Sequence, residues 1–235
     1  GVIIVLVEEQ QFQVATFRAE ADYQDGRRPE TVVFANAQAD AARRDFTVNG
    51  LFFDPVSEKL HDWVGGEADL RAKTIRTIGS PGERFAEDHL RLLRAVRFAA
   101  QLGFAIEPST FAAIQKLAAK IKIISAERVR DELLKLFQPP HAARGLELLH
   151  ATGLLEHILP ELATTVTCEQ SPDYHPEGSV FNHLCLMLKQ LPADAPPLLP
   201  WTVLMHDSAK PLTASRDEKT GSIHFYEHEK IGADL

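Results

Sequence analysis

The spacing of apolar residues changes near residue 66, and this change limits the fold more than any other feature of the chain. Before it, VIIVLV and QFQVATFR are apolar or alternating runs of strand length, and the polar EEQ between them is typical of a hairpin. Asp25-Gly26 signals a further turn. After residue 66, successive stretches repeat their apolar residues at helical spacing up to residue 158. Strands first and helices afterwards predict the α+β class.

Short signals divide the helical part into separate helices. Gly103 should end a long helix that begins near residue 84, and Ser109 and Ser125 should each cap a following helix. Pro139-Pro140 should separate two more, because proline cannot continue a helix. A polar stretch with two prolines, CEQSPDYHPEGS, then leads into a histidine-rich end.

These patterns predict three regions, a β-rich head over 1–65, a helical neck and body over 66–165, and a third helical region over 171–235. The 235 residues are 45% hydrophobic and 25% charged, which suits a folded soluble protein. No apolar run approaches the roughly 20 residues that cross a bilayer. Cys168 and Cys185 imply neither a disulfide framework nor a zinc site. We therefore expect a cytoplasmic protein with no membrane partner.

The charge is distributed unevenly. The chain as a whole carries −8, which argues against a nucleic-acid partner. Residues 71–145, however, hold 14 lysines and arginines against 7 acidic residues. Such a basic segment in an acidic protein indicates a surface that binds nucleic acid, although charge alone is equally well explained by a solvated helical face.

The stretch EDHLRLLRAVRF, residues 87–98, places Arg91, Arg94 and Arg97 three residues apart and Asp88 three residues before them. On a continuous helix, at about 100° per residue, the aspartate and the arginines share one face and the apolar residues the other. One interpretation is a solvated face with an (i, i+3) ion pair worth about 0.2–0.5 kcal/mol. The face contains arginine and no lysine, however, and the planar guanidinium suits phosphates and base edges.

Asp88 and Arg91 together would discriminate between nucleobases. The carboxylate only accepts hydrogen bonds and the guanidinium only donates them. On their Watson–Crick edges, cytosine and adenine each have an amino donor beside a ring-nitrogen acceptor, whereas uracil and guanine have the reverse arrangement. The pair therefore suits C and A, and each buried group left unpaired by U or G costs about 1–3 kcal/mol.

Four motifs in this order resemble the bacterial-type tRNA nucleotidyltransferases, the CCA-adding enzymes, and their relatives the bacterial poly(A) polymerases. They are RRDFTVNGLFFDP (43–55), DWVGGEADL (62–70), RFAEDHLRLLRAVRFAAQLGF (84–104) and SAERVRDEL (125–133). The resemblance runs from about residue 3 to the end of the chain. It implies the distal part of a nucleotidyltransferase-type mixed β-sheet head, followed by an all-helical neck and body and part of an HD domain.

The resemblance also implies roles for single residues. The RRD residues that would contact the incoming nucleotide are Arg43, Arg44 and Asp45, with Arg44 foremost. Asp88 and Arg91 would be the protein template that selects CTP and ATP, whereas Arg94 and Arg97 would bind the nucleotide and stiffen the site. The implied activity is the addition of CCA to the acceptor end of tRNA.

Two motifs of the family are absent from the sequence, a glycine-rich GGxxRD loop and the DxD pair that binds two catalytic Mg²⁺ ions. Attack by the tRNA 3′-hydroxyl on the α-phosphate depends on those ions. We expect the pair upstream of residue 1, in a chain cut at both ends, because the sequence opens on GVIIVLV without a methionine. Gln13 also stands where the family often has an acidic residue. This fragment alone should therefore not add nucleotides.

The histidine-rich end suggests a second site. His183 and the adjacent His206-Asp207 form the first part of an HD-type metal phosphohydrolase site, and imidazole with carboxylate suits a divalent transition metal that activates water. HDSAKP also resembles the HDxxKP of the family's HD domain. His224 and His228 would supply ligands of a second metal if the residues between them are helical. For any single histidine, a scattered surface or core residue is the alternative.

The Asp that closes an HD site is expected beyond Leu235, with Asp234 as the weaker candidate. Besides CCA addition, three functions therefore stay open. The first is poly(A) addition, because Asp88 and Arg91 are compatible with ATP alone. The second is an HD-type metal-dependent phosphohydrolase whose front half only binds nucleotide. The third is a non-catalytic RNA-binding protein.

Overall fold

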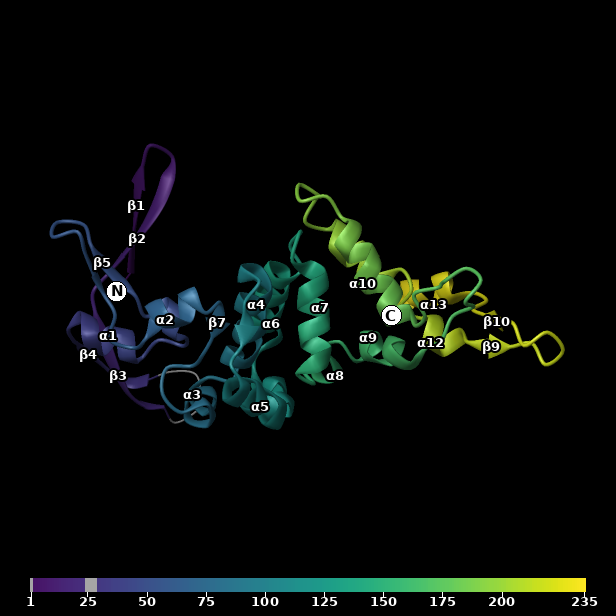
Figure 1. The fold of residues 1–235 in the computed structure, drawn as a ribbon, viewed down its shortest axis with the longest axis horizontal. Helices are drawn as coiled ribbons and strands as arrows, with labels where there is room; N and C mark the ends of the chain where they lie inside the picture. Colours follow the sequence, from purple (N-terminus) through teal and green to yellow (C-terminus); the bar gives the residue numbers. More distant parts are fainter. Residues whose placement is uncertain (1, 24–28) are drawn as a thin grey trace. The chain divides into compact units, whose positions relative to one another are not determined.

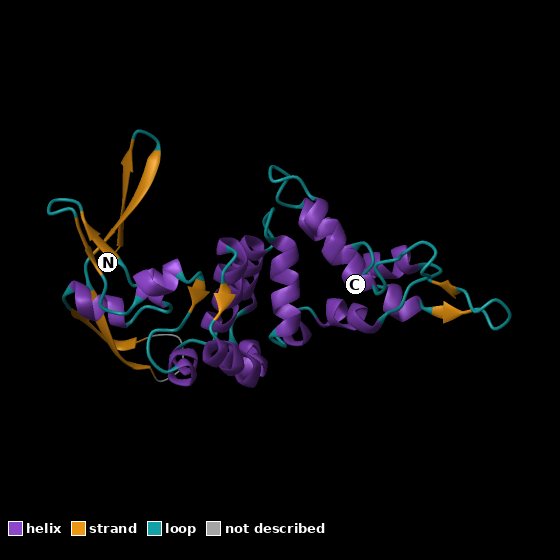
Figure 2. Cartoon of the chain, in the orientation of Figure 1, coloured by secondary structure: helices purple, strands orange, loops and turns teal. Residues whose placement is uncertain are grey.

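A computed structural model describes residues 2–23 and 29–235, so the Asp25-Gly26 turn signal lies outside the described residues. The chain forms two compact units, Gly1–Arg91 and Leu92–Leu235. Strands are concentrated in the first unit and the second is mostly helical (Figures 1 and 2). The expected α+β class is confirmed.

The strands of the first unit pair as antiparallel two-stranded ladders. The pairs are β1 (Val2–Val7) with β2 (Gln10–Ala15), β3 (Arg18–Tyr23) with β4 (Pro29–Phe34), and β5 (Phe52–Asp54) with β6 (Lys59–His61). In the first hairpin the turn residues Glu8 and Glu9 have φ angles of 47° and 69°. The hairpin predicted from VIIVLV and QFQVATFR is therefore present, and Gln13 lies in β2 opposite Ile4.

Short helices and turns complete the first unit. They are α1 (Ala37–Ala42), a 3₁₀ turn (Thr47–Asn49), α2 (Gly66–Arg71), β7 (Thr74–Ile75) and α3 (Pro81–Glu87). Phe46, Ile75 and Phe85 are fully buried and form the centre of its apolar core. Phe46, which directly follows the RRD motif, is part of this core and anchors the end of the motif.

The motif DWVGGEADL has a structural explanation. The carboxylate of Asp62 accepts hydrogen bonds from the backbone N–H groups of four residues at the start of α2, Val64 to Glu67, at 2.8–3.1 Å. A Cβ at Gly66 would lie 2.2 Å from the Thr47 carbonyl oxygen, so only glycine fits there. Asp69 accepts from the Thr47 hydroxyl at 2.7 Å. The motif therefore fastens α2 to the turn after RRD.

The second unit is a succession of helices. Its elements are most of α4 (Leu90–Leu102), β8 (Ala105–Ile106), α5 (Pro108–Leu117), a 3₁₀ helix (Ala118–Ile123), α6 (Ala126–Leu136), α7 (Ala142–Ala151), α8 (Leu155–Ile158), α9 (Pro160–Thr164), a 3₁₀ turn (Thr165–Thr167), α10 (Val180–Gln190), α11 (Leu199–Met205), α12 (Lys210–Thr213), β9 (Ser215–Arg216), β10 (Ile223–His224) and α13 (His228–Asp234). None of the helices in the described residues is long and apolar enough to cross a membrane.

Several local signals are confirmed. Gly103, with a φ of 64°, follows the last residue of α4. Ser125 occupies the N-cap position of α6, as expected, but its side chain makes no capping hydrogen bond there. Pro139-Pro140 lies between α6 and α7. These positions could be identified because each depends on the backbone preferences of one or two residues.

Three expectations about helices are wrong. The helical pattern after residue 66 ends at Arg71 and is followed by a short strand, β7. Ser109 lies inside α5, whose cap is Glu107, because the Glu107 carboxylate accepts from the Thr110 N–H at 2.8 Å. The long helix expected from residue 84 is broken after Glu87 and resumes at Leu90.

Candidate functional sites

Arg43 and Arg44 bind one buried carboxylate, that of Asp40 in α1. Arg43 Nη2 lies 2.5 Å from Oδ1, and Arg44 Nε and Nη2 each lie 3.2 Å from Oδ2. Burial by itself would raise the pKa of Asp40, but hydrogen bonds from Arg43, the Arg18 backbone and Arg44 hold it below the ordinary value. Asp40 is therefore ionised at neutral pH and orients both arginines.

The side chains of Arg44 and Asp45 differ in their exposure to solvent. Arg44 donates to the Asn49 carbonyl at 2.9 Å, and its guanidinium lies 4.6 Å from the centre of the Phe52 ring, yet 39% of its side chain is exposed. Asp45 is buried, and its Oδ1 accepts from the Phe46 N–H and from Asn49 Nδ2, both at 2.9 Å. Asp45 thus shapes the 3₁₀ turn, whereas Arg44 has a solvent-facing portion.

Asp88 lies at the junction between α3 and α4 and not on a helix. Its backbone is extended, with φ −152° and ψ 107°, and its Oδ1 accepts from the Leu90 N–H at 3.0 Å. Asp88 therefore caps α4, and the expectation that it shares a continuous helix face with the arginines is wrong. The arginines, from Arg91 onward, do belong to one helix.

Glu87 joins two arginines at this junction. Its Oε2 accepts from Arg84 Nη1 at 3.0 Å and from Arg91 Nη1 at a shorter contact. Arg84 also donates to the Ala42 carbonyl at 3.0 Å, and both arginines reach the Arg43 carbonyl at 3.5 Å. Arg91 is 9% exposed. Arg91 is thus hydrogen-bonded to the backbone of the RRD segment.

Arg94 and Arg97 share a different carboxylate, Glu132 of α6. Arg97 Nε lies 2.5 Å from Glu132 Oε2, and Arg94 Nη1 lies 3.5 Å from Oε1. Arg97 also donates to Gln101 at 2.8 Å and stacks over the Phe98 ring at 3.9 Å. Glu132 and Arg97 are both buried. Arg97 therefore forms a buried ion pair with Glu132, whereas 30% of the Arg94 side chain is exposed.

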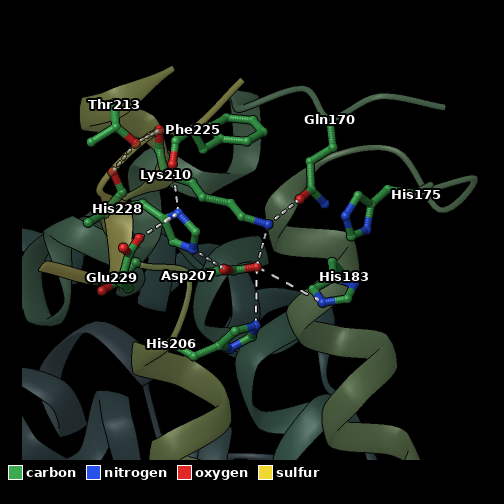
Figure 3. A network of polar contacts seen from close by, with 12 residues as sticks. Gln170, His175, His183, His206, Asp207, Lys210, Thr213, Phe225, His228 and Glu229 are labelled. Atoms are coloured by element: carbon green, nitrogen blue, oxygen red, sulfur yellow. Dashed lines mark hydrogen bonds and ion pairs between the residues drawn. The ribbon is translucent and has the colours of Figure 1, made fainter. Parts of the chain in front are cut away.

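In the histidine-rich end, Asp207 lies at the centre of a cluster of nitrogen atoms (Figure 3). His206 Nε2 lies 3.1 Å from Oδ2, His183 Nε2 lies 4.0 Å from the same oxygen, and His228 Nε2 lies 3.4 Å from Oδ1. Lys210 Nζ is 2.8 Å from Oδ2. Side-chain ligand atoms of His183, His206 and Asp207 all lie within 4.8 Å of one another, close enough to hold one metal ion.

The three imidazoles of this cluster share one orientation. Each has an acceptor at Nδ1: Glu177 Oε1 for His183 at 2.6 Å, the Val203 carbonyl for His206 at 2.8 Å, and the Phe225 carbonyl for His228 at 2.7 Å. A neutral imidazole with its proton on Nδ1 has its lone pair on Nε2. All three Nε2 atoms face Asp207, and His206 Nε2 is close enough to donate to it. If a metal ion displaced that proton, three imidazole nitrogens and a carboxylate would converge, which is a donor set that divalent transition metals prefer.

Buried charge around Asp207 is balanced. Burial would raise the pKa of Asp207, but hydrogen bonds from His206 and Lys210 hold it far below its ordinary value. The hydrogen bond to Asp207 likewise raises the pKa of His206. Lys210, itself buried, also donates to Gln170 Oε1 at 2.8 Å. The site therefore combines an ionised carboxylate with a fixed ammonium group.

The helical spacing considered for His224 and His228 is wrong. His224 ends β10 and its ring stacks on Tyr226 at 5.2 Å, whereas His228 begins α13. His175 and Glu177 lie near His183 instead. The Glu177 Oε1 atom is 3.1 Å from His175 Nδ1 and 2.6 Å from His183 Nδ1. The structure therefore groups His228, but not His224, with the HD residues.

Two family descriptions match the chain, "Poly A polymerase head domain" over residues 1–76 and "Probable RNA and SrmB- binding site of polymerase A" over residues 103–165. A CCA-adding enzyme of Latilactobacillus sakei is 40% identical over 202 residues, which cover 83% of this chain and 50% of that protein. One of Geobacillus stearothermophilus is 43% identical over 164 residues, 69% of this chain and 40% of that protein. The chain belongs to the bacterial CCA-adding enzyme family.

This family includes enzymes of more than one described specificity. An A-adding tRNA nucleotidyltransferase of Deinococcus radiodurans is 40% identical over 208 residues, 85% of this chain and 47% of that protein. A solved Bacillus stearothermophilus CCA-adding enzyme in complex with CTP superposes with a TM-score of 0.63 at 36% identity, over 71% of this chain and 40% of that one. The chain spans about half the length of the curated relatives it matches.

Sequence reasoning missed the carboxylates that organise each group of CCA-family residues. Asp40 precedes the two RRD arginines by three and four residues, a spacing that predicts contact on one helix. Glu132 lies within the SAERVRDEL motif but 35 residues from Arg97, and no sequence signal joins them. Glu177 stands beside His175 in the HPEG stretch, where its proline and glycine suggested only a loop.

Proposed function

We propose that the protein containing this chain adds nucleotides from CTP and ATP to the 3′ end of tRNA. The observation that supports this most is the Glu87 network, because it ties Arg91 to the backbone of the RRD segment. Two motifs more than 40 residues apart are thereby held as one unit. The same residues resemble the nucleotide-contacting and template motifs of the family.

In this proposal Arg91 is oriented in advance. Glu87 and the Arg84 carbonyl both accept from Nη1, so the plane of the guanidinium is fixed before a base arrives. Asp88, three residues earlier, is held by its cap bond to the Leu90 N–H. Fixed donors and acceptors discriminate bases strongly, because a wrong base leaves polar groups unpaired.

Of the remaining motif residues, we propose that some contact the nucleotide and that others hold those residues in position. We propose that Arg44, with 39% of its side chain exposed, contacts the nucleotide, and that Asp45 supports it by shaping the following turn. Arg94, which is partly exposed, is the better candidate for a phosphate contact. Arg97 braces the helix from inside, because Glu132, Gln101 and Phe98 surround its guanidinium.

Enzymes of this family depend on a metal ion, and Mg²⁺ is the ion we propose for the polymerase reaction. The sequence contains no DxD pair to hold two Mg²⁺ ions, so the present residues are assigned to nucleotide recognition only. The basic segment 71–145 is proposed to bind tRNA phosphates, and such binding should weaken steeply with salt.

The decisive experiment supplies the full-length protein with tRNA that lacks its 3′ end and with CTP, ATP, UTP or GTP in turn. We expect C and A to be incorporated and U and G to be rejected. Addition of A to a tRNA that already ends in CC, without addition of C, would indicate the specificity described for the Deinococcus relative. Long poly(A) products without C would support a poly(A) polymerase and contradict CCA addition.

The convergence of three imidazole Nε2 atoms on Asp207 favours a second candidate function, a metal-dependent phosphohydrolase. His183, His206 and Asp207, joined by His228, would hold a divalent transition metal. Such an ion supplies an activated water at neutral pH and polarises a phosphoryl oxygen. Lys210 fixes the ionised form of Asp207 beside it.

Metal analysis of the purified full-length protein tests this second function. About one equivalent of a transition metal is expected in the native protein and none in His206→Ala, with hydrolysis of a phosphate ester lost in parallel. We propose a cytoplasmic location for both activities, in keeping with two free, buried cysteines. A native protein that binds no transition metal would remove the second candidate and leave tRNA nucleotide addition unaffected.

A further inference from the structure

His183 is the one imidazole of the cluster whose Nδ1 acceptor is a charged side chain. Its Nδ1 lies 2.6 Å from Glu177 Oε1, whereas the corresponding acceptors of His206 and His228 are backbone carbonyls. Its Nε2 lies 4.0 Å from Asp207 Oδ2, beyond hydrogen-bond distance. The ring therefore stands between two carboxylates and is bonded to only one of them.

The hydrogen-bonding chemistry of this contact determines which nitrogen carries the proton. A carboxylate only accepts, so the short contact to Glu177 requires N–H at Nδ1 and leaves the lone pair at Nε2, on the side of Asp207 and His206. A neutral histidine without such a partner would not be held in the tautomer that carries its proton on Nδ1. Glu177 thus supplies to His183 what the backbone supplies to His206 and His228.

Glu177 is itself fixed on the start of α10. The Glu177 carbonyl accepts from Asn182 Nδ2 at 3.0 Å, and Ser179, the N-cap of the helix, accepts from the Asn182 N–H at 3.3 Å. Gly178 between them has a φ of 95°, which favours glycine. His175 donates a second contact to Glu177 Oε1 at 3.1 Å, and its ring meets that of His183 edge-on at 4.8 Å.

We propose that Glu177 is a positioning residue for the histidine cluster, holding His183 in the Nδ1–H form so that Nε2 is available to a metal ion. The inference rests on the proposed metal-dependent function. His175 acts through Glu177, limiting the rotation of its carboxylate. Carboxylates that bind the far nitrogen of a ligand histidine typically change metal affinity about 10–100-fold.

His175, Glu177 and His183 could be read instead as ligands of a separate ion, because their ligand atoms also lie within 4.8 Å of one another. The 2.6 Å separation argues for a hydrogen bond at His183 Nδ1. A metal at that nitrogen would also require a bridging imidazolate if Nε2 served the Asp207 centre. The stoichiometry of metal binding distinguishes the two.

The first measurement needs no metal. In full-length protein labelled with ¹⁵N-histidine, the ring nitrogen shifts of His183 should report the Nδ1–H form in the native protein and in Glu177→Gln, whose amide oxygen still accepts. Glu177→Ala should lose this form. Glu229→Gln is the matched control, since that carboxylate lies 3.6 Å from His228 Nδ1 and is mostly exposed. Retention of the Nδ1–H form in Glu177→Ala would overturn the proposal.

The second measurement is the affinity for Co²⁺, determined by chelator competition and by the visible spectrum of the bound ion. Glu177→Ala should bind about 10–100-fold more weakly with an altered spectrum, Glu177→Gln should lose less, and Glu229→Gln should match the native protein. Unchanged affinity in Glu177→Ala contradicts the positioning role. A native protein that binds two ions, of which Glu177→Ala binds only one, also contradicts it, because Glu177 would then be a ligand of a separate ion. A native protein that binds no Co²⁺ refutes the metal function, whereas the tautomer measurement separately decides the hydrogen bond.

Discussion

The arginine sites and the histidine cluster are both built around buried carboxylates, but they use them differently. Asp40 and Glu132 are surrounded by guanidinium groups that carry a permanent charge. Asp207 is surrounded by one ammonium group and three imidazoles whose Nδ1 atoms have other partners. Arginine keeps its charge and only donates hydrogen bonds, whereas an imidazole can give up its Nε2 proton and then offer a lone pair to a further ligand. The type of basic side chain around the carboxylate therefore distinguishes two sites that hold side chains rigidly from one that could accept a further ligand.

The largest effect should come from removing the centre of an arginine site. Glu132→Ala would leave the buried Arg97 without its carboxylate, and loss of one partner of a buried pair costs about 3–5 kcal/mol. Chemical denaturation should show this loss in the free energy of unfolding. The control is Glu147→Ala, whose carboxylate pairs with the exposed Lys189, and for which about 0–1 kcal/mol is expected. Equal effects of the two changes would show that Glu132 is not a structural centre.

His206→Ala tests whether the histidine cluster behaves differently. The change removes one of three converging nitrogens and leaves the Asp207–Lys210 pair in place, so folding should survive while metal binding falls from about one equivalent to none. Elemental analysis and denaturation of the same samples measure the two properties. A loss of stability comparable to that of Glu132→Ala, with metal retained, would show that the cluster is an ordinary buried network.

Asp88→Ala should relax the choice of nucleotide more than it weakens triphosphate binding. One lost base contact corresponds to about 1–3 kcal/mol, or roughly 5- to 150-fold in discrimination. Incorporation of the four nucleotides by the full-length protein measures it. Because Asp88 also caps α4, Asp88→Ser is the control that keeps an acceptor for the Leu90 N–H. Continued exclusion of UTP and GTP in both variants would refute the base-reading role.

The smallest effect concerns Glu107, a carboxylate held by neutral donors. Burial alone would raise its pKa, but hydrogen bonds from the hydroxyl and N–H groups of Ser109 and Thr110 lower it from 4.5 to about 2. A lowered pKa contributes stability that is full above pH 4.5 and is lost as the pH falls toward 2. Glu107→Ala should therefore cost about 1 kcal/mol at pH 7 and less at pH 3. A cost that does not change with pH would exclude the carboxylate as its source.

The sequence predicted the parts of the sites that are local. Arg91, Arg94 and Arg97 share a helix because three-residue spacing on a helix places them on neighbouring positions. Asp88 was misplaced, because apolar periodicity continues through the Asp88-His89 break and does not register a change in backbone direction. His224 and His228 were paired on a helical spacing that the backbone between β10 and α13 does not adopt.

By itself the sequence determined the α+β class, the family motifs and the residues whose chemistry suits nucleotides and metals. These follow from side-chain type and from spacing over a few residues, which local sterics and hydrogen bonding control. Only the tertiary structure decided which carboxylate each cation binds, that Arg97 is buried, and that three imidazoles face Asp207. Such pairings join residues up to 35 positions apart, and they depend on how helices pack, a property that no short pattern encodes.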